Sequence, residues 1–296
     1  MITDSTVYVT AFKDKEMMFE RLRKVKHVAL DMDGTIYNGD TLFPYTKIFL
    51  KNLDEMGISY SFLTNNPSKS TSDYLLHLEK MGLTISAGEI YTSAHATISY
   101  LAGHHPDIRK IFFVGTSSMI GEFEQAGFLS AADNPDDEPD AVVIGFDPAL
   151  SYARLTRAAW WIRKKKLYLA TNPDYVCPTD QPVVLVDCGS ICAALEKATG
   201  RVPDVVLGKP DPEMLQGIKR GNGLKQDEIA MVGDRIYTDL LMAQRANALG
   251  VLVLSGESTL EDVDAAGFLP DIVTDSIESF GELLAQSRAE AGKVVN

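Results

Sequence analysis

The stretch HVALDMDGT, residues 27–35, decides the fold of this 296-residue chain. Its apolar start predicts a buried strand, and the carboxylates and Gly34 that come next predict a tight turn at the strand's carboxyl end. Asp31 and Asp33 therefore project into the region where open α/β sheets bind ligands. Two like charges this close are unfavourable unless a cation or a proton lies between them. The pair suits covalent catalysis, in which one carboxylate attacks phosphorus and the other transfers protons, but alone it also fits an ordinary capped turn.

Helix and strand patterns alternate on both sides of this stretch. In the first part of the chain, helices are expected in residues 15–25, 45–56 and 70–82, and a second apolar strand in residues 58–66. Toward the C-terminus, strands are expected within residues 202–208, 228–234 and 248–256, with helices between them. Such alternation is typical of a parallel sheet whose strands are joined by crossover helices. The expected fold class is therefore α/β.

The middle of the chain has the pattern of a separate unit. Three more apolar strands are expected in KIFFVGT, AVVIGFD and LYLATNPD, and a helix in residues 151–166. Boundaries near residues 86 and 204 would make residues 1–85 and 205–296 one discontinuous domain, with residues 86–204 inserted into it. The pattern alone leaves two sequential domains as the alternative.

Three further polar motifs lie at the ends of apolar strands. FLTNN, residues 62–66, offers a hydroxyl and backbone N–H groups that could cradle an anion, although it also fits a capped helix. GKPDP, residues 208–212, holds Lys209 in a stiff backbone, whereas most lysines are simply solvated. VGDR, residues 232–235, is followed by Thr238 and Asp239 and adds carboxylates that suit Mg²⁺, although it also fits a helix N-cap.

In this order, DMDGT, TNN, the lysine of GKPDP and GDRIYTD resemble the four motifs of the haloacid dehalogenase (HAD) superfamily of phosphohydrolases. The segments YNG, VGTSSM, AVVIGFD, ATNPD and CGSI are similar to its NagD-like, or 4-nitrophenylphosphatase-like, subfamily. The resemblance covers the chain from about His27 to its C-terminal end. It implies a Rossmann-like parallel-sheet core with an inserted α/β cap domain of the C2 type, which favours the discontinuous arrangement.

The resemblance also implies a role for each motif residue. Asp31 would be the nucleophile that forms an aspartyl-phosphate, and Asp33 the general acid and base. Lys209 would neutralise charge on Asp31 and on the phosphoryl group. The remaining expected residues are Thr64, Asn65 and Asn66 for phosphate binding, Asn172 and Asp174 for substrate contacts from the cap, Asp31, Asp234 and the Asp33 carbonyl as Mg²⁺ ligands, and Gly34 and Asp239 in support, with Asp239 orienting Lys209 or a metal-bound water.

Charge and composition narrow the class of ligand. The 28 basic and 41 acidic residues give a net charge of −13, which argues against nucleic-acid and membrane-surface partners. Three cysteines make no disulfide scaffold, and Cys188 and Cys192 lack the further ligands of a zinc site. The sequence has no secretory signal pattern and no membrane-spanning run, so a cytoplasmic location is expected.

The expected function is Mg²⁺-dependent hydrolysis of small phosphomonoesters, such as sugar phosphates or nucleoside monophosphates. The expected partner is a small phosphorylated metabolite, and the cap could support a homodimer. The alternative is a receiver-like or regulatory phosphate-binding protein with little turnover. Intact Asp31, Asp33, Lys209 and Asp234 argue against that alternative. A nucleotide-binding enzyme is less well supported, because the chain has neither a G-x-x-x-x-G-K-[ST] motif nor a complete G-x-G-x-x-G motif.

Overall fold

The computed structural model describes residues 9–65, 70–177 and 184–291. The chain folds into two compact units. Unit 1 comprises Met1–Leu63, His77–Ile90 and Ile218–Asn296, and unit 2 comprises Thr64–Leu76 and Tyr91–Gly217. The predicted domain boundaries near residues 86 and 204 stay predictions.

The strands of unit 1 form a largely parallel sheet, here called the first sheet. In the described residues its strand order is β1 (Val9–Thr10), β16 (Ile272–Thr274), β15 (Leu249–Val253), β14 (Ile229–Gly233), β2 (His27–Asp31), β5 (Ser59–Thr64) and β6 (Ile90–Thr92). The central strands β5, β2, β14, β15 and β16 run parallel, and β1 is antiparallel to β16. The α/β fold class and its parallel core sheet are thereby confirmed.

The register of β2 and β14 places two of the predicted site residues at one edge of the first sheet. Leu30 of β2 lies opposite Val232 of β14 and Phe62 of β5, and all three side chains are buried. Because neighbouring parallel strands end at the same edge of the sheet, the residues just after Leu30 and Val232 emerge side by side. Asp31 and Asp234 are among these residues.

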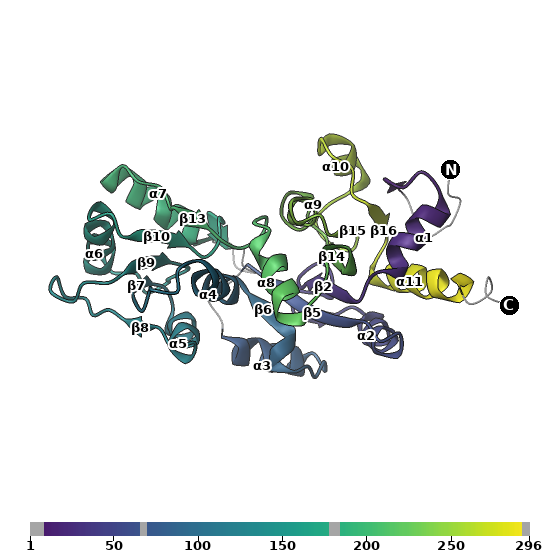
Figure 1. Ribbon diagram of the computed structural model, residues 1–296, viewed down its shortest axis with the longest axis horizontal. Coiled ribbons are helices and arrows are strands. Elements are labelled where there is room, and N and C mark those ends of the chain that lie inside the picture. Colours follow the sequence, from purple (N-terminus) through teal and green to yellow (C-terminus); the bar gives the residue numbers. More distant parts are fainter. Residues whose placement is uncertain (1–8, 66–69, 178–183, 292–296) are drawn as a thin grey trace. The chain divides into compact units, whose positions relative to one another are not determined.

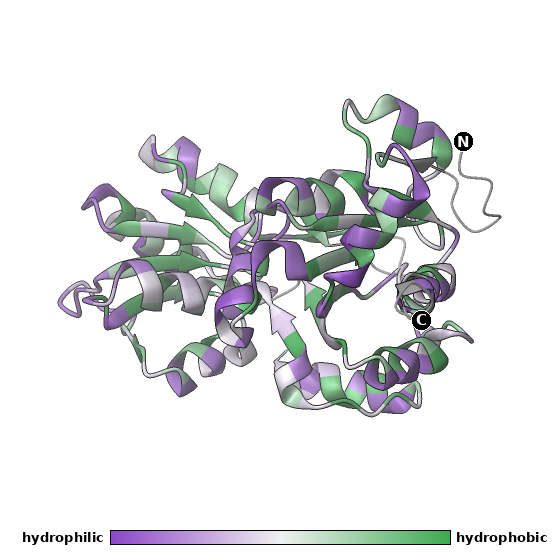
Figure 2. Ribbon diagram, turned by 45° about the vertical axis from the view of Figure 1, so that its right-hand side comes forward, coloured by the Kyte–Doolittle hydropathy of each residue, from purple (hydrophilic) through white to green (hydrophobic). Residues whose placement is uncertain are grey.

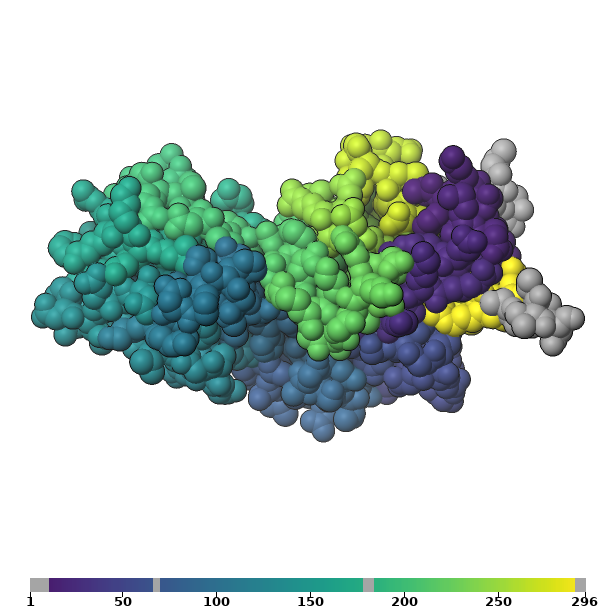
Figure 3. Space-filling model, viewed as in Figure 1, coloured from purple at the N-terminus to yellow at the C-terminus, as the bar shows by residue number. Residues whose placement is uncertain are grey.

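Helices cover the first sheet. Those that lie wholly in unit 1 are α1 (Lys15–Arg23), α2 (Thr46–Glu55), α9 (Leu241–Ala246), α10 (Leu260–Ala265) and α11 (Ile277–Ala291), while α3 (Thr71–Lys80) and α8 (Glu213–Asn222) cross the unit boundaries. Short 3₁₀ turns occupy Ala87–Glu89 and Gln226–Glu228, and a π-helical segment occupies Ile236–Leu240. Helix α1 packs against α11, so the two ends of the described chain lie together (Figures 1 and 3).

Unit 2 contains the second sheet, which is parallel throughout the described residues. Its order is β13 (Val205–Val206), β10 (Leu167–Ala170), β9 (Ala141–Ile144), β7 (Lys110–Val114) and β8 (Leu129–Ser130). Four helices of this unit are α4 (Ser93–His104), α5 (Ser117–Gln125), α6 (Tyr152–Arg163) and α7 (Cys188–Thr199). Strand β13 belongs to this sheet, although the sequence pattern assigned its residues to the outer segments.

Alternating side chains give the second sheet two apolar faces, because successive residues of a strand point to opposite sides. On one face, Phe112 and Val142 pack with Trp161 of α6 and Cys188 of α7. The other face packs against α4 and α5, with Ile111, Phe113, Val143, Leu101 and Phe123 among its buried residues. The apolar strands of both sheets stand out in green in Figure 2.

Two short antiparallel ribbons complete the described strands. They pair β3 (Tyr37–Asn38) with β4 (Thr41–Leu42), and β11 (Val176–Cys177) with β12 (Leu185–Val186). Among the described helices, none combines the length and apolar character needed to cross a membrane.

Candidate active site

Three carboxylates gather at the carboxyl edge of the first sheet. Asp31 ends β2, Asp234 comes directly after β14, and Asp239 lies in the π-helical segment. One carboxylate oxygen from each lies within 4.8 Å of the others, and the three residues are 9%, 2% and 0% exposed. The sequence predicts the first two as metal ligands and the third as a supporting residue. The structure shows that all three belong to one buried cluster.

Glycines make room for this cluster. A Cβ on Gly34 would lie 2.4 Å from Asp234 Oδ2, and one on Gly256 would lie 2.1 Å from the same atom. Gly34 also has a φ of +83°, which side chains disfavour. The Asp234 carboxylate is then fixed by the backbone, since Glu257 N donates to its Oδ2 at 2.7 Å. The glycine of DMDGT is therefore needed for space as well as for the turn.

A π-helical turn brings Asp239 into the cluster. The sequence predicts an ordinary helix in the segment after β14, whereas the structure has the π-helical segment Ile236–Leu240 before α9. Arg235 N donates to Asp239 Oδ2 at 3.2 Å, which ties this carboxylate back to the end of β14. Such π-helical turns often occur at functional sites.

One guanidinium lies beside the carboxylates. Burial lowers the pKa of Arg235, but the charges of Asp234 and Asp31 outweigh burial and raise it overall. Its Nε is 2.9 Å from Glu257 Oε2, so part of its charge is already paired. A cluster of three buried carboxylates beside one paired cation favours a further cation, and hard oxygen donors suit Mg²⁺.

Asp33 differs from Asp31 in its exposure to solvent. It is exposed, and its Oδ1 accepts a hydrogen bond from Gly39 N at 3.1 Å. Its carboxylate is not part of the metal-type cluster of described residues. The expected role of Asp33, with its carbonyl on a metal and its carboxylate in proton transfer, stays a prediction.

The other expected residues that the structure describes belong to unit 2. Thr64 ends β5, and its Oγ1 lies 3.5 Å from Tyr74 Oη. Burial raises the pKa of Tyr74, so its hydroxyl stays protonated. Lys209, only 5% exposed, lies three residues after the end of β13. Asn66 lies outside the described residues.

Asn65, Asn172, Asp174 and Lys209 are brought together within unit 2. The Asn65 side chain hydrogen-bonds to the Lys209 backbone, with Oδ1 accepting at 2.6 Å and Nδ2 donating at 2.9 Å. Asp174 Oδ2 accepts from Asn65 Nδ2 at 3.0 Å and from Asn172 Nδ2 at 3.1 Å. Asn172 is fully buried. These residues therefore hold one another in place.

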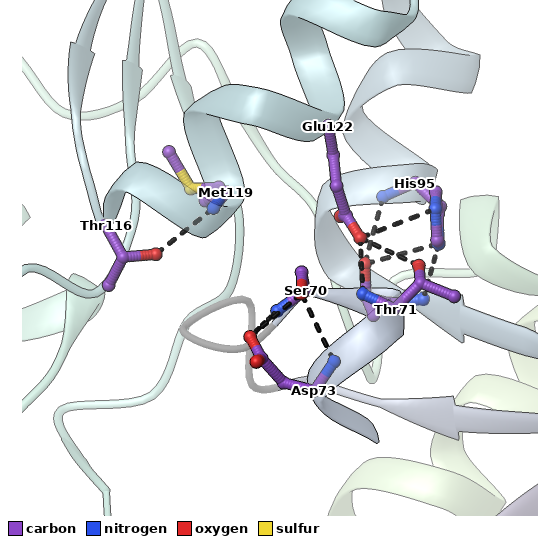
Figure 4. Close-up of polar contacts among 8 residues, drawn as sticks. Ser70, Thr71, Asp73, His95, Thr116, Met119 and Glu122 are labelled. Atoms are coloured by element: carbon purple, nitrogen blue, oxygen red, sulfur yellow. Dashed lines mark hydrogen bonds and ion pairs between the residues drawn. The ribbon is translucent and has the colours of Figure 1, made fainter. Parts of the chain in front are cut away.

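Glu122 is a polar residue that sequence analysis did not single out. Its Oε1 accepts from both N and Oγ1 of Thr71, each at 2.8 Å, at the start of α3 (Figure 4). His95 Nε2 lies 3.9 Å from the same oxygen. Burial lowers the pKa of His95, and the charge of Glu122 opposes this change. No spacing rule could have paired Glu122 with a residue 51 positions earlier in the chain.

Comparisons with known proteins agree with this architecture. The family of haloacid dehalogenase-like hydrolases matches residues 28–129, and a second HAD-hydrolase-like family matches residues 206–280. The ribonucleotide monophosphatase NagD of Escherichia coli is 31% identical over 253 residues, which cover 86% of this chain and 97% of the relative.

Two solved structures are similar along most of the chain. The 4-nitrophenylphosphatase of Thermotoga maritima is 38% identical, with a TM-score of 0.82 over 88% of this chain and 98% of the other. A glycerol phosphate phosphatase of Mycobacterium tuberculosis, in complex with magnesium, is 29% identical, with a TM-score of 0.78 over 87% of this chain and 77% of the other.

The parallel sheet and the strand-end carboxylates are those of a phosphohydrolase. The chain belongs to the haloacid dehalogenase-like hydrolases, in their NagD-like subfamily, and is a phosphatase that acts on phosphomonoesters.

Proposed function

We propose that this phosphatase hydrolyses small phosphomonoesters with Mg²⁺ through an aspartyl-phosphate on Asp31. The observation that carries the proposal is the cluster of Asp31, Asp234 and Asp239, whose oxygens lie within 4.8 Å of one another. Without a cation, a phosphate dianion beside such a cluster would be strongly repelled. The magnesium complex of the mycobacterial phosphatase supports the choice of metal.

The donor set of this cluster fits Mg²⁺, which prefers oxygen ligands and commonly uses one or two carboxylates. We assign the carboxylates of Asp31 and Asp234 and the carbonyl of Asp33 as its ligands. Asp239 supports a metal-bound water or Lys209. When bound, Mg²⁺ offsets negative charge on the carboxylates and on the phosphoryl group.

In the first chemical step, a carboxylate oxygen of Asp31 attacks phosphorus. The bond from phosphorus to the ester oxygen breaks, and the leaving oxygen takes a proton from Asp33. In the second step, Asp33 accepts a proton from water while that water attacks phosphorus. The bond from phosphorus to Asp31 then breaks and releases phosphate. The Asp33 carboxylate is exposed, which suits this exchange of protons. The Asp31 carboxylate is buried, which suits a nucleophile that must be held in one position.

Unit 2 supplies the remaining proposed groups. Thr64, the Asn65 backbone and Asn66 bind the phosphate, and Lys209 neutralises charge on it. Residues 86–204 form the cap, from which Asn172 and Asp174 influence substrate choice. The proposed substrates are nucleoside monophosphates or sugar phosphates, and the NagD relative supports the first class. A homodimer through the cap and a cytoplasmic location stay predictions.

The test combines metal removal with trapping of the intermediate. We expect hydrolysis of 4-nitrophenyl phosphate to stop in excess chelator, after bound metal has been removed, and to return with added Mg²⁺. Acid quenching during turnover of a ³²P-labelled substrate should yield protein-bound phosphate, which Asp31→Asn abolishes. Full activity in the metal-free protein, or no labelled protein at any quench time, would contradict the proposal.

A further inference from the structure

The loop that carries Lys209 is held by a single amide side chain. Asn65 Oδ1 accepts from Lys209 N at 2.6 Å, and Asn65 Nδ2 donates to Lys209 O at 2.9 Å. One carboxamide therefore satisfies both backbone polar groups of one residue. Since Lys209 is only 5% exposed, its side chain has little freedom, and the backbone position strongly restricts where its amine can lie.

The same amide reaches a second loop. Asn65 Nδ2 also donates to Asp174 Oδ2 at 3.0 Å, and Asn172 Nδ2 donates to that oxygen at 3.1 Å. Both donor positions of the Asn65 amide are thus engaged. The loops that contain Asp174 and Lys209 begin at the ends of β10 and β13, which are parallel neighbours in the second sheet. Asn65 therefore joins two adjacent strand ends of unit 2.

Gly208 provides independent evidence that the fold accommodates this contact. A Cβ at this position would lie 2.8 Å from Asn65 Oδ1 and 2.9 Å from the carbonyl oxygen of Thr171. Its φ of +77° also favours glycine. Any larger residue would push the carboxamide away from the Lys209 backbone. The residue before Lys209 is thus suited to the approach of Asn65.

From this geometry we infer that the Asn65 side chain is a positioning residue for Lys209, and that it links Lys209 to the loop of Asp174. The inference rests on the proposed function, in which Lys209 neutralises the phosphoryl group. It assigns the Asn65 side chain a task separate from that of its backbone N–H. A displacement of about 1 Å at such a group can cost on the order of a hundredfold in rate.

A double-mutant cycle tests whether Asn65 acts through Lys209. Asn65→Ala should lower kcat for 4-nitrophenyl phosphate about tenfold or more in the wild-type background. In the Lys209→Ala background, the same change should lower kcat less than about twofold, because no amine remains to be positioned. Asn52→Ala, an exposed asparagine on α2, is the matched control and should leave kcat unchanged. Equal losses in both backgrounds would overturn the inference.

Hydrogen exchange gives a readout that does not need activity. Asn65 Oδ1 accepts the Lys209 N–H, so peptides that cover residues 207–211 should exchange faster in Asn65→Ala and not in Asn52→Ala. Unchanged exchange would also overturn the inference. Gly208→Ala keeps Asn65 in the sequence but pushes its carboxamide away, so it should reproduce both the lower kcat and the faster exchange. This variant replaces Asn65→Ala in the test if Asn65→Ala fails to fold. Wild-type kcat in Lys209→Ala would instead contradict the proposed function, and the exchange rates would still decide whether Asn65 holds the loop.

Discussion

The polar residues of the two units are held in opposite ways. In unit 1, Asp31, Asp234 and Asp239 are like charges that cluster at the ends of parallel strands. In unit 2, Asn65 and Asp174 are donor and acceptor in a network whose members satisfy one another. Like charges this close are unfavourable unless a cation or a proton lies between them, whereas each hydrogen bond of the second group joins a donor to an acceptor. Under the proposed function, unit 1 would supply the nucleophile and the metal ligands, and unit 2 would supply Lys209 and the groups that bind phosphate and substrate.

The largest expected effect distinguishes the loss of the nucleophile in unit 1 from the loss of a substrate contact in unit 2. Asp31→Asn should lower kcat at least about a thousandfold, roughly 4 kcal/mol, because an amide is a far poorer nucleophile than a carboxylate. Asp174→Ala should mainly raise KM for a preferred substrate and alter the ranking of substrates. The measurement is kcat and KM for both variants on one panel of phosphomonoesters. An Asp174→Ala variant with equal losses on every substrate would remove the distinction between the units.

The second effect concerns the free energy of unfolding of unit 1. His27 is 1% exposed within β2, and burial lowers its pKa to about 4. The folded unit therefore resists protonation of His27. The contribution of the neutral imidazole to the free energy of unfolding is fully present above the unfolded-state pKa of about 6.5, and it is lost as the pH falls toward 4. Over this window we expect a loss of about 3 kcal/mol.

The chain offers separate probes for this test. Both tryptophans lie in α6 of unit 2, so their fluorescence reports on that unit, while far-UV circular dichroism reports on both. His27→Asn, which does not titrate, should flatten the dependence of stability on pH between 6.5 and 4. If wild type and variant lose stability in parallel over this range, the buried imidazole is not the cause.

Sequence reasoning could predict the features that depend on strand ends and local spacing. Asp31 and Asp234 were found because an apolar run ends in a carboxylate, and the structure places both at one sheet edge. A helix is predicted over residues 70–82, and α3 begins at Thr71, where Ser70 exchanges hydrogen bonds with Asp73, three residues later. Such features lie within one segment, which a single sequence displays.

Contacts between distant segments could not be predicted. Asn65 and Lys209 are 144 residues apart, and neither segment contains a sequence pattern that identifies the other as its partner. Glu257 N, which fixes Asp234, comes from a loop 23 residues later, and only the position of its backbone matters. Pairing of this kind is set by tertiary packing, so it requires the folded chain. The π-helical start at Ile236 was missed for the same reason.

The third effect compares two glycines. Gly256→Ala would place a Cβ 2.1 Å from Asp234 Oδ2 and displace that carboxylate. We expect the Mg²⁺ concentration for half-maximal activity to rise about tenfold, roughly 1.4 kcal/mol. Gly189→Ala in unit 2 would instead place a Cβ 2.3 Å from Pro173 O, beside Asp174. It should change KM while the Mg²⁺ dependence stays that of wild type. Equal shifts in Mg²⁺ dependence would show that the two units do not divide these tasks.

The smallest effect compares two acidic groups at the start of α3. Glu122 is buried and accepts from Thr71, whereas the exposed Asp73 accepts from Ser70 (Figure 4). Both place negative charge at a helix N-terminus, where it is stabilising. In each case, exchange for the amide keeps an acceptor oxygen and removes the charge. Because water screens the exposed site, Glu122→Gln should lower the free energy of unfolding by about 1 kcal/mol and Asp73→Asn by about 0.3 kcal/mol.

Urea denaturation monitored by tryptophan fluorescence measures both changes in unit 2, where Trp160 and Trp161 lie. Neither variant should alter the Mg²⁺ dependence of activity, because neither residue belongs to the carboxylate cluster of unit 1. A larger loss for Asp73→Asn than for Glu122→Gln would mean that the local cap, which the sequence displays, matters more than the distant one. The contact between α5 and the start of α3 would then contribute little to the stability of unit 2.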